Sequence, residues 1–220
     1  MLVLVIDDHP IVLEGCQQLL KYSGVQQILQ AKSLADGFRL YRSQKPDVII
    51  VDLAMRTGTL NGLSFIRRLR LHDKRTPILV FSMHSDPFIV SLALKTGADG
   101  YIVKDTMGEE IVTAFEKVRD GTPYLNHELA SEVAFMEARG RTSNPLRSAT
   151  VRELQILSLL AEGKAYAQIA ADLGVSYKTI ANTCGQLKTK LGVDSLPALL
   201  RIAIEYLPTA AAGTERAGHD

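Results

Sequence analysis

Residues 47–52 read Asp-Val-Ile-Ile-Val-Asp, and this stretch decides the fold of the chain. Four β-branched residues in a row, with no polar side chain among them, predict a short strand that is buried on both faces of a parallel sheet. Asp52 follows this strand directly. In open parallel α/β sheets, ligands bind beyond the carboxyl ends of the strands, so Asp52 is the first candidate for chemistry.

The same pattern recurs through the first half of the chain and alternates with helical periodicity. We expect strands at residues 2–6, 26–31, 48–51, 78–81 and 100–103. Apolar residues at three- and four-residue spacing predict helices at residues 11–22, 34–42, 62–71, 87–96 and 107–120. This alternation predicts an α/β domain over residues 1–125, with a flavodoxin-like, doubly wound, five-stranded parallel sheet.

The second half of the chain has a different pattern. Residues 126–148 are polar and rich in turn formers, which predicts a linker that opens with a short helix over 128–139. Thr150 and Glu153 form a capping box, so a helix is expected to begin there. Two further helices, 166–173 and 177–191, are separated by a glycine turn, which is typical of a helix-turn-helix.

We therefore expect a small all-α helix-turn-helix domain over residues 149–208, which ends with a helix at 196–207. The Ala/Gly/Thr-rich residues 209–220 predict a disordered tail.

Composition limits the classes of protein that fit the chain. At 220 residues with 46% hydrophobic residues, two compact domains can each build a core. The net charge of +1 means that any nucleic-acid contact must come from a local cluster of Lys and Arg. Cys16 and Cys184 lie on apolar faces and predict buried, reduced thiols. The first apolar run ends at Asp7 and no 18-residue apolar span follows, so we expect a soluble, cytoplasmic protein without a membrane segment.

Acidic side chains follow two of the expected strands. Asp7 and Asp8 come directly after the first strand, as Asp52 does after the third. An acid in this position can simply cap the next helix, but three carboxylates at one sheet edge repel one another strongly. A hard divalent cation with oxygen ligands relieves this repulsion, so we expect Mg²⁺ at this edge.

A hydroxyl and an ammonium group are expected at the same edge, because Ser82 follows the fourth strand and Lys104 the fifth. The hydroxyl can donate a hydrogen bond to a phosphoryl oxygen, and the lysine can neutralise a transferring phosphate. With a nucleophilic carboxylate, these groups predict an aspartyl-phosphate site.

The first domain resembles the receiver domain of bacterial two-component response regulators of the NarL/FixJ type. The matching stretches are Val-Ile-Asp-Asp-His-Pro at 5–10, Val-Asp-Leu at 51–53, Phe-Ser-Met-His at 81–84 and Gly-Ala-Asp-Gly-Tyr-Ile-Val-Lys-Asp at 97–105. The resemblance implies that Asp52 is the phosphoacceptor. It also implies that Asp8, Asp52 and the backbone carbonyl of Ala54 hold Mg²⁺, with Asp7 acting through a metal-bound water.

The same resemblance implies that Ser82 and Tyr101 form a switch pair, in which the hydroxyl moves toward the phosphoryl group and the ring turns inward. One loop departs from the pattern of the family. Arg56 stands where relatives usually have a proline, and Asn61-Gly62 comes two residues later than the matching glycine. The loop after the acceptor is thus longer, which either alters phosphotransfer or is a neutral surface insertion.

Residues 177–191 have two distinct faces. Ile180, Cys184, Leu187 and Leu191 follow helical spacing and predict the face turned to the core. The segment carries three lysines and no acid, which is typical of a helix that contacts nucleic acid, although a solvated surface helix is the alternative.

The second domain resembles the LuxR-type helix-turn-helix. The matching stretches are Thr-Val-Arg-Glu at 150–153, Leu-Ala-Glu-Gly at 160–163, Gln-Ile-Ala at 168–170, Leu-Gly-Val-Ser at 173–176, Lys-Thr-Ile at 178–180 and Lys-Leu-Gly-Val at 190–193. The resemblance implies binding to double-stranded DNA. The candidate contact residues are Lys178, Thr179, Ala181, Asn182, Gly185, Lys188 and Lys190.

Ala181 and Gly185 are small where relatives often carry a long polar side chain, which predicts reduced direct readout and heavier reliance on phosphate contacts. Asn182 is the best candidate for a base edge, because an amide can bond adenine bidentately. The resemblance also implies that helix 196–207 pairs with its twin, so that a homodimer reads two half-sites about one helical turn apart.

Together these patterns predict a phosphorylation-controlled transcription regulator that receives its phosphoryl group from a sensor histidine kinase. It would not be an enzyme in its own right. Two other classes remain open from the sequence. A small aspartyl-phosphate phosphohydrolase would use the same carboxylates, and an atypical receiver would bind DNA or a partner without phosphorylation.

Overall fold

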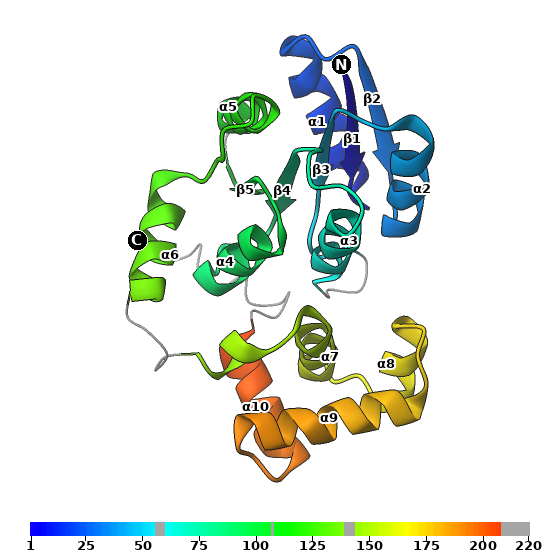
Figure 1. Ribbon diagram of the computed structural model, residues 1–220, viewed down its shortest axis with the longest axis vertical. Helices are drawn as coiled ribbons and strands as arrows, with labels where there is room; N and C mark the ends of the chain where they lie inside the picture. Colours follow the sequence, from blue (N-terminus) through cyan, green and yellow to red (C-terminus); the bar gives the residue numbers. More distant parts are fainter. Residues whose placement is uncertain (56–59, 107, 139–143, 208–220) are drawn as a thin grey trace. The chain divides into compact units, whose positions relative to one another are not determined.

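The structure is a computed structural model that describes residues 1–55, 60–106, 108–138 and 144–207. Figure 1 shows a parallel sheet flanked by helices in the first part of the chain. Its strands are β1 (Leu2–Ile6), β2 (Gln27–Ala31), β3 (Val48–Val51), β4 (Ile78–Ser82) and β5 (Gly100–Val103). The strands pair in the order β2-β1-β3-β4-β5, which confirms the predicted five-stranded, doubly wound sheet.

Helices cover both faces of this sheet. They are α1 (Pro10–Tyr22), α2 (Leu34–Gln44), α3 (Asn61–Arg70), α4 (Pro87–Thr96) and α5 (Gly108–Arg119). Helices α1 and α5 contact each other on one face, and α2, α3 and α4 form a row on the other. Side chains alternate between the two faces along each strand. Val3 and Ile50 therefore join Leu13 and Phe115 in the core beneath α1 and α5, while the neighbouring Ile49 is buried on the opposite face.

The expected element boundaries agree with the structure to within two residues. Helix α1 begins one residue early, at Pro10, because proline fits the first turn of a helix. Helix α2 continues to Gln44 and ends where Lys45 adopts a left-handed conformation with φ 48°. Residue 107, which we expected in the fifth helix, lies outside the described residues, and α5 is described from Gly108.

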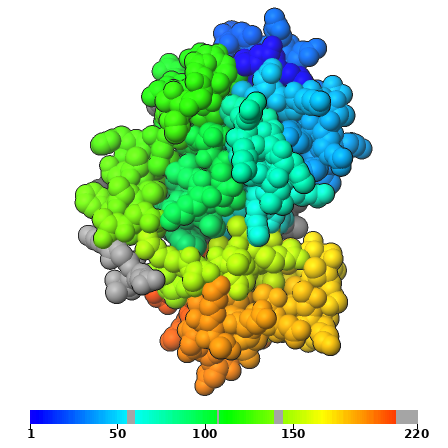
Figure 2. Space-filling view, in the orientation of Figure 1, coloured from blue at the N-terminus to red at the C-terminus, as the bar shows by residue number. Residues whose placement is uncertain are grey.

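Part of the segment that we predicted as a linker forms helix α6 (His127–Ala138), which lies along α4 (Figures 1 and 2). Leu129 of α6 is buried. Glu137 Oε1 accepts hydrogen bonds from Ser91 Oγ at 2.8 Å and from Lys95 Nζ at 2.7 Å. The first compact unit of the chain therefore extends to Ala138, beyond the boundary at residue 125 expected from sequence. The remainder of the predicted linker is described only from residue 144, and the predicted tail at 209–220 lies outside the described residues.

The regular elements in the described part of the second compact unit are all helices. It contains η2 (Pro145–Ser148), α7 (Val151–Ala161), α8 (Tyr166–Asp172), α9 (Tyr177–Leu191) and α10 (Leu196–Tyr206). The predicted capping box is confirmed: Thr150 Oγ1 accepts a hydrogen bond from Glu153 N at 3.2 Å, and the Glu153 carboxylate accepts one from Thr150 N at 2.6 Å. Helices α8 and α9 pack against each other and against α7, which is the helix-turn-helix arrangement that we expected.

Both cysteines are buried and free, as predicted: Cys16 is 2% exposed and Cys184 is 1% exposed. None of the helices in the described ranges is long and apolar enough to cross a lipid bilayer.

Candidate phosphorylation site and nucleic-acid interface

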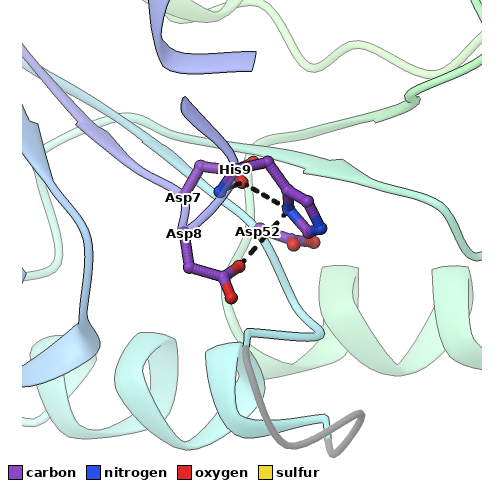
Figure 3. Close-up of side chains that lie close together, drawn as sticks. All are labelled: Asp7, Asp8, His9 and Asp52. Carbon is purple, nitrogen blue, oxygen red and sulfur yellow. Dashed lines mark hydrogen bonds and ion pairs between the residues drawn. The ribbon is translucent and has the colours of Figure 1, made fainter. Parts of the chain in front are cut away.

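The carboxyl ends of β1 and β3 bring Asp7 and Asp52 side by side. The two strands are neighbours in parallel register, with Ile6 opposite Val51. Asp52 N donates to Ile6 O at 3.0 Å, which continues the ladder by one residue. The Asp7 and Asp52 residues are each only 2% exposed. The convergence of acids that we predicted from the strand ends is therefore present, as Figure 3 shows for Asp7, Asp8, His9 and Asp52.

Lys104 joins these two carboxylates. Its Nζ lies 2.7 Å from Asp7 Oδ2 and 2.8 Å from Asp52 Oδ2, and its side chain is 4% exposed. The backbone after β5 positions it, because Lys104 N donates to Ser82 O at 2.9 Å. Burial lowers the pKa of Lys104, but attraction and hydrogen bonds from Asp52 and Asp7 outweigh that effect, and the net shift of the pKa is upward. The lysine is thus a fully charged ammonium between two acids.

His9 is a member of this cluster to which the sequence analysis assigned no role. Its Nδ1 lies 2.9 Å from Asp7 Oδ1 and 3.3 Å from Asp8 Oδ1, while 57% of its side chain is exposed (Figure 3). His9 N also donates to Asp7 Oδ1 at 2.9 Å. The position of His9 directly after the Asp7-Asp8 pair was the available signal, because a residue that follows a strand end can turn back over the preceding side chains.

The donor set fits a hard divalent cation. One possible ligand atom from each of Asp7, Asp8, His9 and Asp52 lies within 4.8 Å of all the others. Three of these groups are carboxylates, the ligands that Mg²⁺ takes from proteins while it keeps several waters. Ala54 N donates to Asp52 Oδ1 at 3.2 Å, which places the start of the following loop beside the acceptor. That the Ala54 carbonyl is a ligand stays a prediction.

Ser82 and Tyr101 lie on the neighbouring strands β4 and β5, and both residues are 0% exposed. The Tyr101 hydroxyl donates to the His84 carbonyl oxygen at 2.7 Å, and His84 N donates to Ser82 Oγ at 3.4 Å. Burial raises the pKa of Tyr101, so its hydroxyl stays protonated and remains a donor. The ring is thus already inward in this structure, whereas we expected phosphorylation to turn it inward.

In the second unit, α9 presents the two faces that its spacing predicted. Ile180, Cys184 and Leu187 are buried, and Leu191 is half-buried. On the other faces, the exposed candidates are Lys178, Thr179, Asn182 and Lys190, and the half-buried ones are Ala181, Gly185 and Lys188.

Lys190 has a partner within its own domain. Its Nζ lies 2.8 Å from Glu153 Oε2 of the capping box. The charge of Lys190 is therefore compensated, which makes it a weaker candidate for a phosphate contact than Lys178. The sequence could not reveal this pair, because the two residues are far apart in the chain.

Arg152 supports the turn between α8 and α9, a role that the sequence analysis did not assign. Arg152 Nη2 donates to Leu173 O at 3.1 Å, at the end of α8. Burial lowers the pKa of Arg152 somewhat, but arginine stays charged in proteins. The guanidinium thus ties the scaffold helix α7 to the turn that sets the direction of α9.

Comparison with known families agrees with this geometry. Residues 3–116 match the response regulator receiver domain, and residues 147–203 match the bacterial regulatory proteins of the luxR family. The chain belongs to the response regulators. This response regulator is 38% identical over 205 residues to the methanol utilization control regulatory protein MoxX of Paracoccus denitrificans, with 93% of this chain and 91% of that protein covered.

The response regulator is also 31% identical over 214 residues to the oxygen regulatory protein NreC of Staphylococcus aureus, with 93% of this chain and 97% of that protein covered. Among solved structures, it is similar to RcsB from Salmonella enterica serovar Typhimurium bound to promoter rprA in the presence of the phosphomimetic BeF3-. That match has a TM-score of 0.67 and 26% identity, and covers 92% of this chain and 98% of RcsB. The relatives are transcriptional regulators, and phosphorylation by a kinase is typical of the family.

Proposed function

We propose that this response regulator accepts a phosphoryl group on Asp52 from the phosphohistidine of a sensor histidine kinase, and then controls transcription as a DNA-bound homodimer. The observation that carries the proposal is the position of Lys104. A buried ammonium within 2.8 Å of both Asp7 and Asp52 costs desolvation energy, and an electrostatic role at the acceptor accounts for its place there.

The chemistry requires the carboxylate of Asp52 to attack phosphorus. The P–N bond of the donor phosphohistidine breaks as an Asp52 oxygen forms a P–O bond, and the released imidazole nitrogen takes up a proton from solvent. Bound Mg²⁺ would supply charge neutralisation for the phosphoryl oxygens. Asp7, Asp8 and Asp52 would hold the ion, with the Ala54 carbonyl as a further ligand. Lys104 would turn from Asp52 to a phosphoryl oxygen, and Ser82 would donate a hydrogen bond to another.

The added charge also provides the regulatory signal. Phosphorylation adds about 1.5 to 2 negative charges, which favours arrangements in which Lys104 pairs with a phosphoryl oxygen and Ser82 moves toward the phosphoryl group. His84, whose carbonyl accepts from Tyr101, follows Ser82 and precedes α4. Helix α4 in turn contacts α6 through Ser91 and Lys95. We infer that this path carries the change toward the DNA-binding domain.

Helix α10 supports the proposed homodimer. Leu199 and Ala203 face the core of its own domain, whereas Leu196 is 37% exposed and Ile204 is 59% exposed. Ile204 and Leu200 also line a shallow, mostly apolar hollow on this helix. An exposed apolar strip of this kind is suited to a twin helix, so that two copies of α9 would reach DNA together.

The test is phosphorylation of the full-length protein by acetyl phosphate with Mg²⁺, read by intact mass spectrometry. The wild type should gain the mass of one phosphoryl group, and Asp52→Asn should gain none. Asp120→Asn, which changes an exposed carboxylate at the end of α5, is the matched control and should behave as the wild type. Phosphorylation should also raise the dimer fraction in light scattering, and Ile204→Glu should abolish that increase. An adduct that still forms in Asp52→Asn contradicts the proposed acceptor.

A further inference from the structure

Tyr177 is a large aromatic residue with an exposed side chain in the second unit. It is the first residue of α9, and it is 59% exposed. We propose that Tyr177 contacts the DNA backbone with its hydroxyl, and that Tyr166 holds it in position. This inference rests on the proposed DNA interface and adds a contact outside the candidate set on α9.

The ring of Tyr177 contacts the ring of a second tyrosine. The centroids of the Tyr166 and Tyr177 rings are 5.9 Å apart, within the range of interacting aromatic pairs, and the rings are tilted by 52°. Tyr166 is the first residue of α8 and is itself half-buried. Tyr177 is therefore pre-positioned, and ordering its side chain on binding costs little conformational entropy.

The chemistry around this pair favours an anionic partner. Lys178 and Thr179 beside Tyr177 are exposed, and residues 177–191 contain no acid. No hydrogen bond within the described parts of the chain engages the Tyr177 hydroxyl, so it can donate to a phosphate oxygen. An apolar protein partner would have to cover these polar neighbours, which disfavours it.

Helix-turn-helix geometry places the pair at the edge of the groove. The first helix of the motif crosses the DNA backbone, and the N-terminal end of the second enters the major groove. Tyr166 and Tyr177 begin these two helices, so their paired rings lie at the boundary between backbone and groove. A hydroxyl at this boundary fits a phosphate contact, which strengthens binding to every sequence by the same factor.

The test uses the full-length protein and a random-sequence duplex of about 30 base pairs, because a phosphate contact is independent of sequence. Tyr177→Phe keeps the ring pair and removes only the hydroxyl. Its affinity should fall about tenfold at low salt, the size of one hydrogen bond to a charged group. The slope of log K against log salt should not change, whereas Lys178→Gln should reduce that slope by about one. Tyr22→Phe, an 89% exposed tyrosine in the receiver, is the matched control and should bind as the wild type.

The positioning role of Tyr166 has its own variants. Tyr166→Phe keeps the ring and should retain nearly full affinity, whereas Tyr166→Leu removes the ring contact and should weaken binding about as much as Tyr177→Phe. The double variant Tyr166→Leu with Tyr177→Phe should be no weaker than either single change, because both remove the same contact. A merely structural role of Tyr166 would give additive losses.

Fluorescence provides a second measurement, because the chain contains no tryptophan. Tyr177→Trp introduces a single emitter at the proposed contact, and its emission should change when the duplex is added. Three outcomes would overturn the Tyr177 contact alone. They are an unchanged DNA affinity of Tyr177→Phe, a loss of affinity in Tyr177→Phe that differs between duplex sequences, and a constant fluorescence of Tyr177→Trp while the duplex binds. Failure of the wild type to bind any duplex overturns the proposed DNA interface, and this contact with it.

Discussion

Gly62 packs directly against the backbone of Asp52. A Cβ on Gly62 would lie 2.7 Å from Leu53 Cα and closer still to the Asp52 carbonyl oxygen, and neither atom can move without shifting the proposed acceptor. Gly62 N also donates to Leu53 O at 3.0 Å. The glycine thus lies against the backbone beside the acceptor, at the start of α3.

We expect Gly62→Ala to destabilise the receiver by about 2 kcal/mol, because the methyl group would overpack a rigid backbone contact. The rate of phosphorylation by acetyl phosphate should fall as well, since Asp52 would shift. Urea unfolding and mass spectrometry measure the two effects. Gly15→Ala in α1 is the control, because no atom lies within 4 Å of a Cβ there. Equal stability of the two variants would show that the backbone around Gly62 can adjust to the methyl group at no cost in free energy.

Replacement of Lys104 should expose the repulsion between Asp7 and Asp52. Without metal, Lys104→Gln should lose about 3 kcal/mol of stability, because two buried carboxylates lose their counter-charge. Added Mg²⁺ should raise the thermal midpoint of this variant more than that of the wild type, since the ion would replace the lost cation. Lys21→Gln, an exposed lysine of α1, is the control. If Mg²⁺ and a chelator shift the thermal midpoints of the wild type, Lys104→Gln and Lys21→Gln equally, there is no cation site at these acids.

The Glu153–Lys190 pair predicts a pH dependence for the DNA-binding domain. Burial raises the pKa of Glu153, but hydrogen bonds from Lys190 and Thr150 outweigh it and hold the pKa below its ordinary value of 4.5. A lowered folded pKa means that this stabilisation is complete above pH 4.5 and is lost as the pH falls through the folded pKa.

Glu153→Gln should therefore cost about 1 kcal/mol at pH 7, and this cost should shrink as the pH falls below 4.5, as measured by urea unfolding. Gln can still accept the hydrogen bond from Thr150 N, so the change isolates the charge. Glu132→Gln, which alters an exposed acid of α6, is the control for the loss of one carboxylate. If the difference in the free energy of unfolding between the wild type and Glu153→Gln stays constant with pH, the charge of Glu153 adds no stability through the pair with Lys190.

Gly185 offers a gain in stability. It lies in the interior of α9, and no atom lies within 4 Å of a Cβ built there. Gly185→Ala should stabilise the second domain by up to about 1 kcal/mol, because alanine favours the helix and meets no obstacle. Gly192→Ala should act in the opposite direction, since Gly192 has φ 68° at the end of the same helix. Calorimetry of the two variants measures both changes in stability. A loss of stability in Gly185→Ala would contradict the conclusion that a Cβ at this position meets no other atom.

Much of the fold could be predicted because its signals are local. The β-branched run before Asp52 and the capping box of Thr150 and Glu153 each act within a few residues. Helix α6 was only partly anticipated, since polar composition predicted a linker. Its docking on α4 depends on Glu137 meeting Ser91 and Lys95, which no local pattern shows.

The sequence by itself determined the family, the order of the two domains and the residue types at the strand ends, because motif order and hydrophobic periodicity are written along the chain. Only the tertiary structure decided which of these groups meet. Strand register brought Lys104 between Asp7 and Asp52, and helix packing paired Lys190 with Glu153 and brought the rings of Tyr177 and Tyr166 into contact. Such contacts join residues far apart in the chain, so their distances depend on the packing of the whole domain.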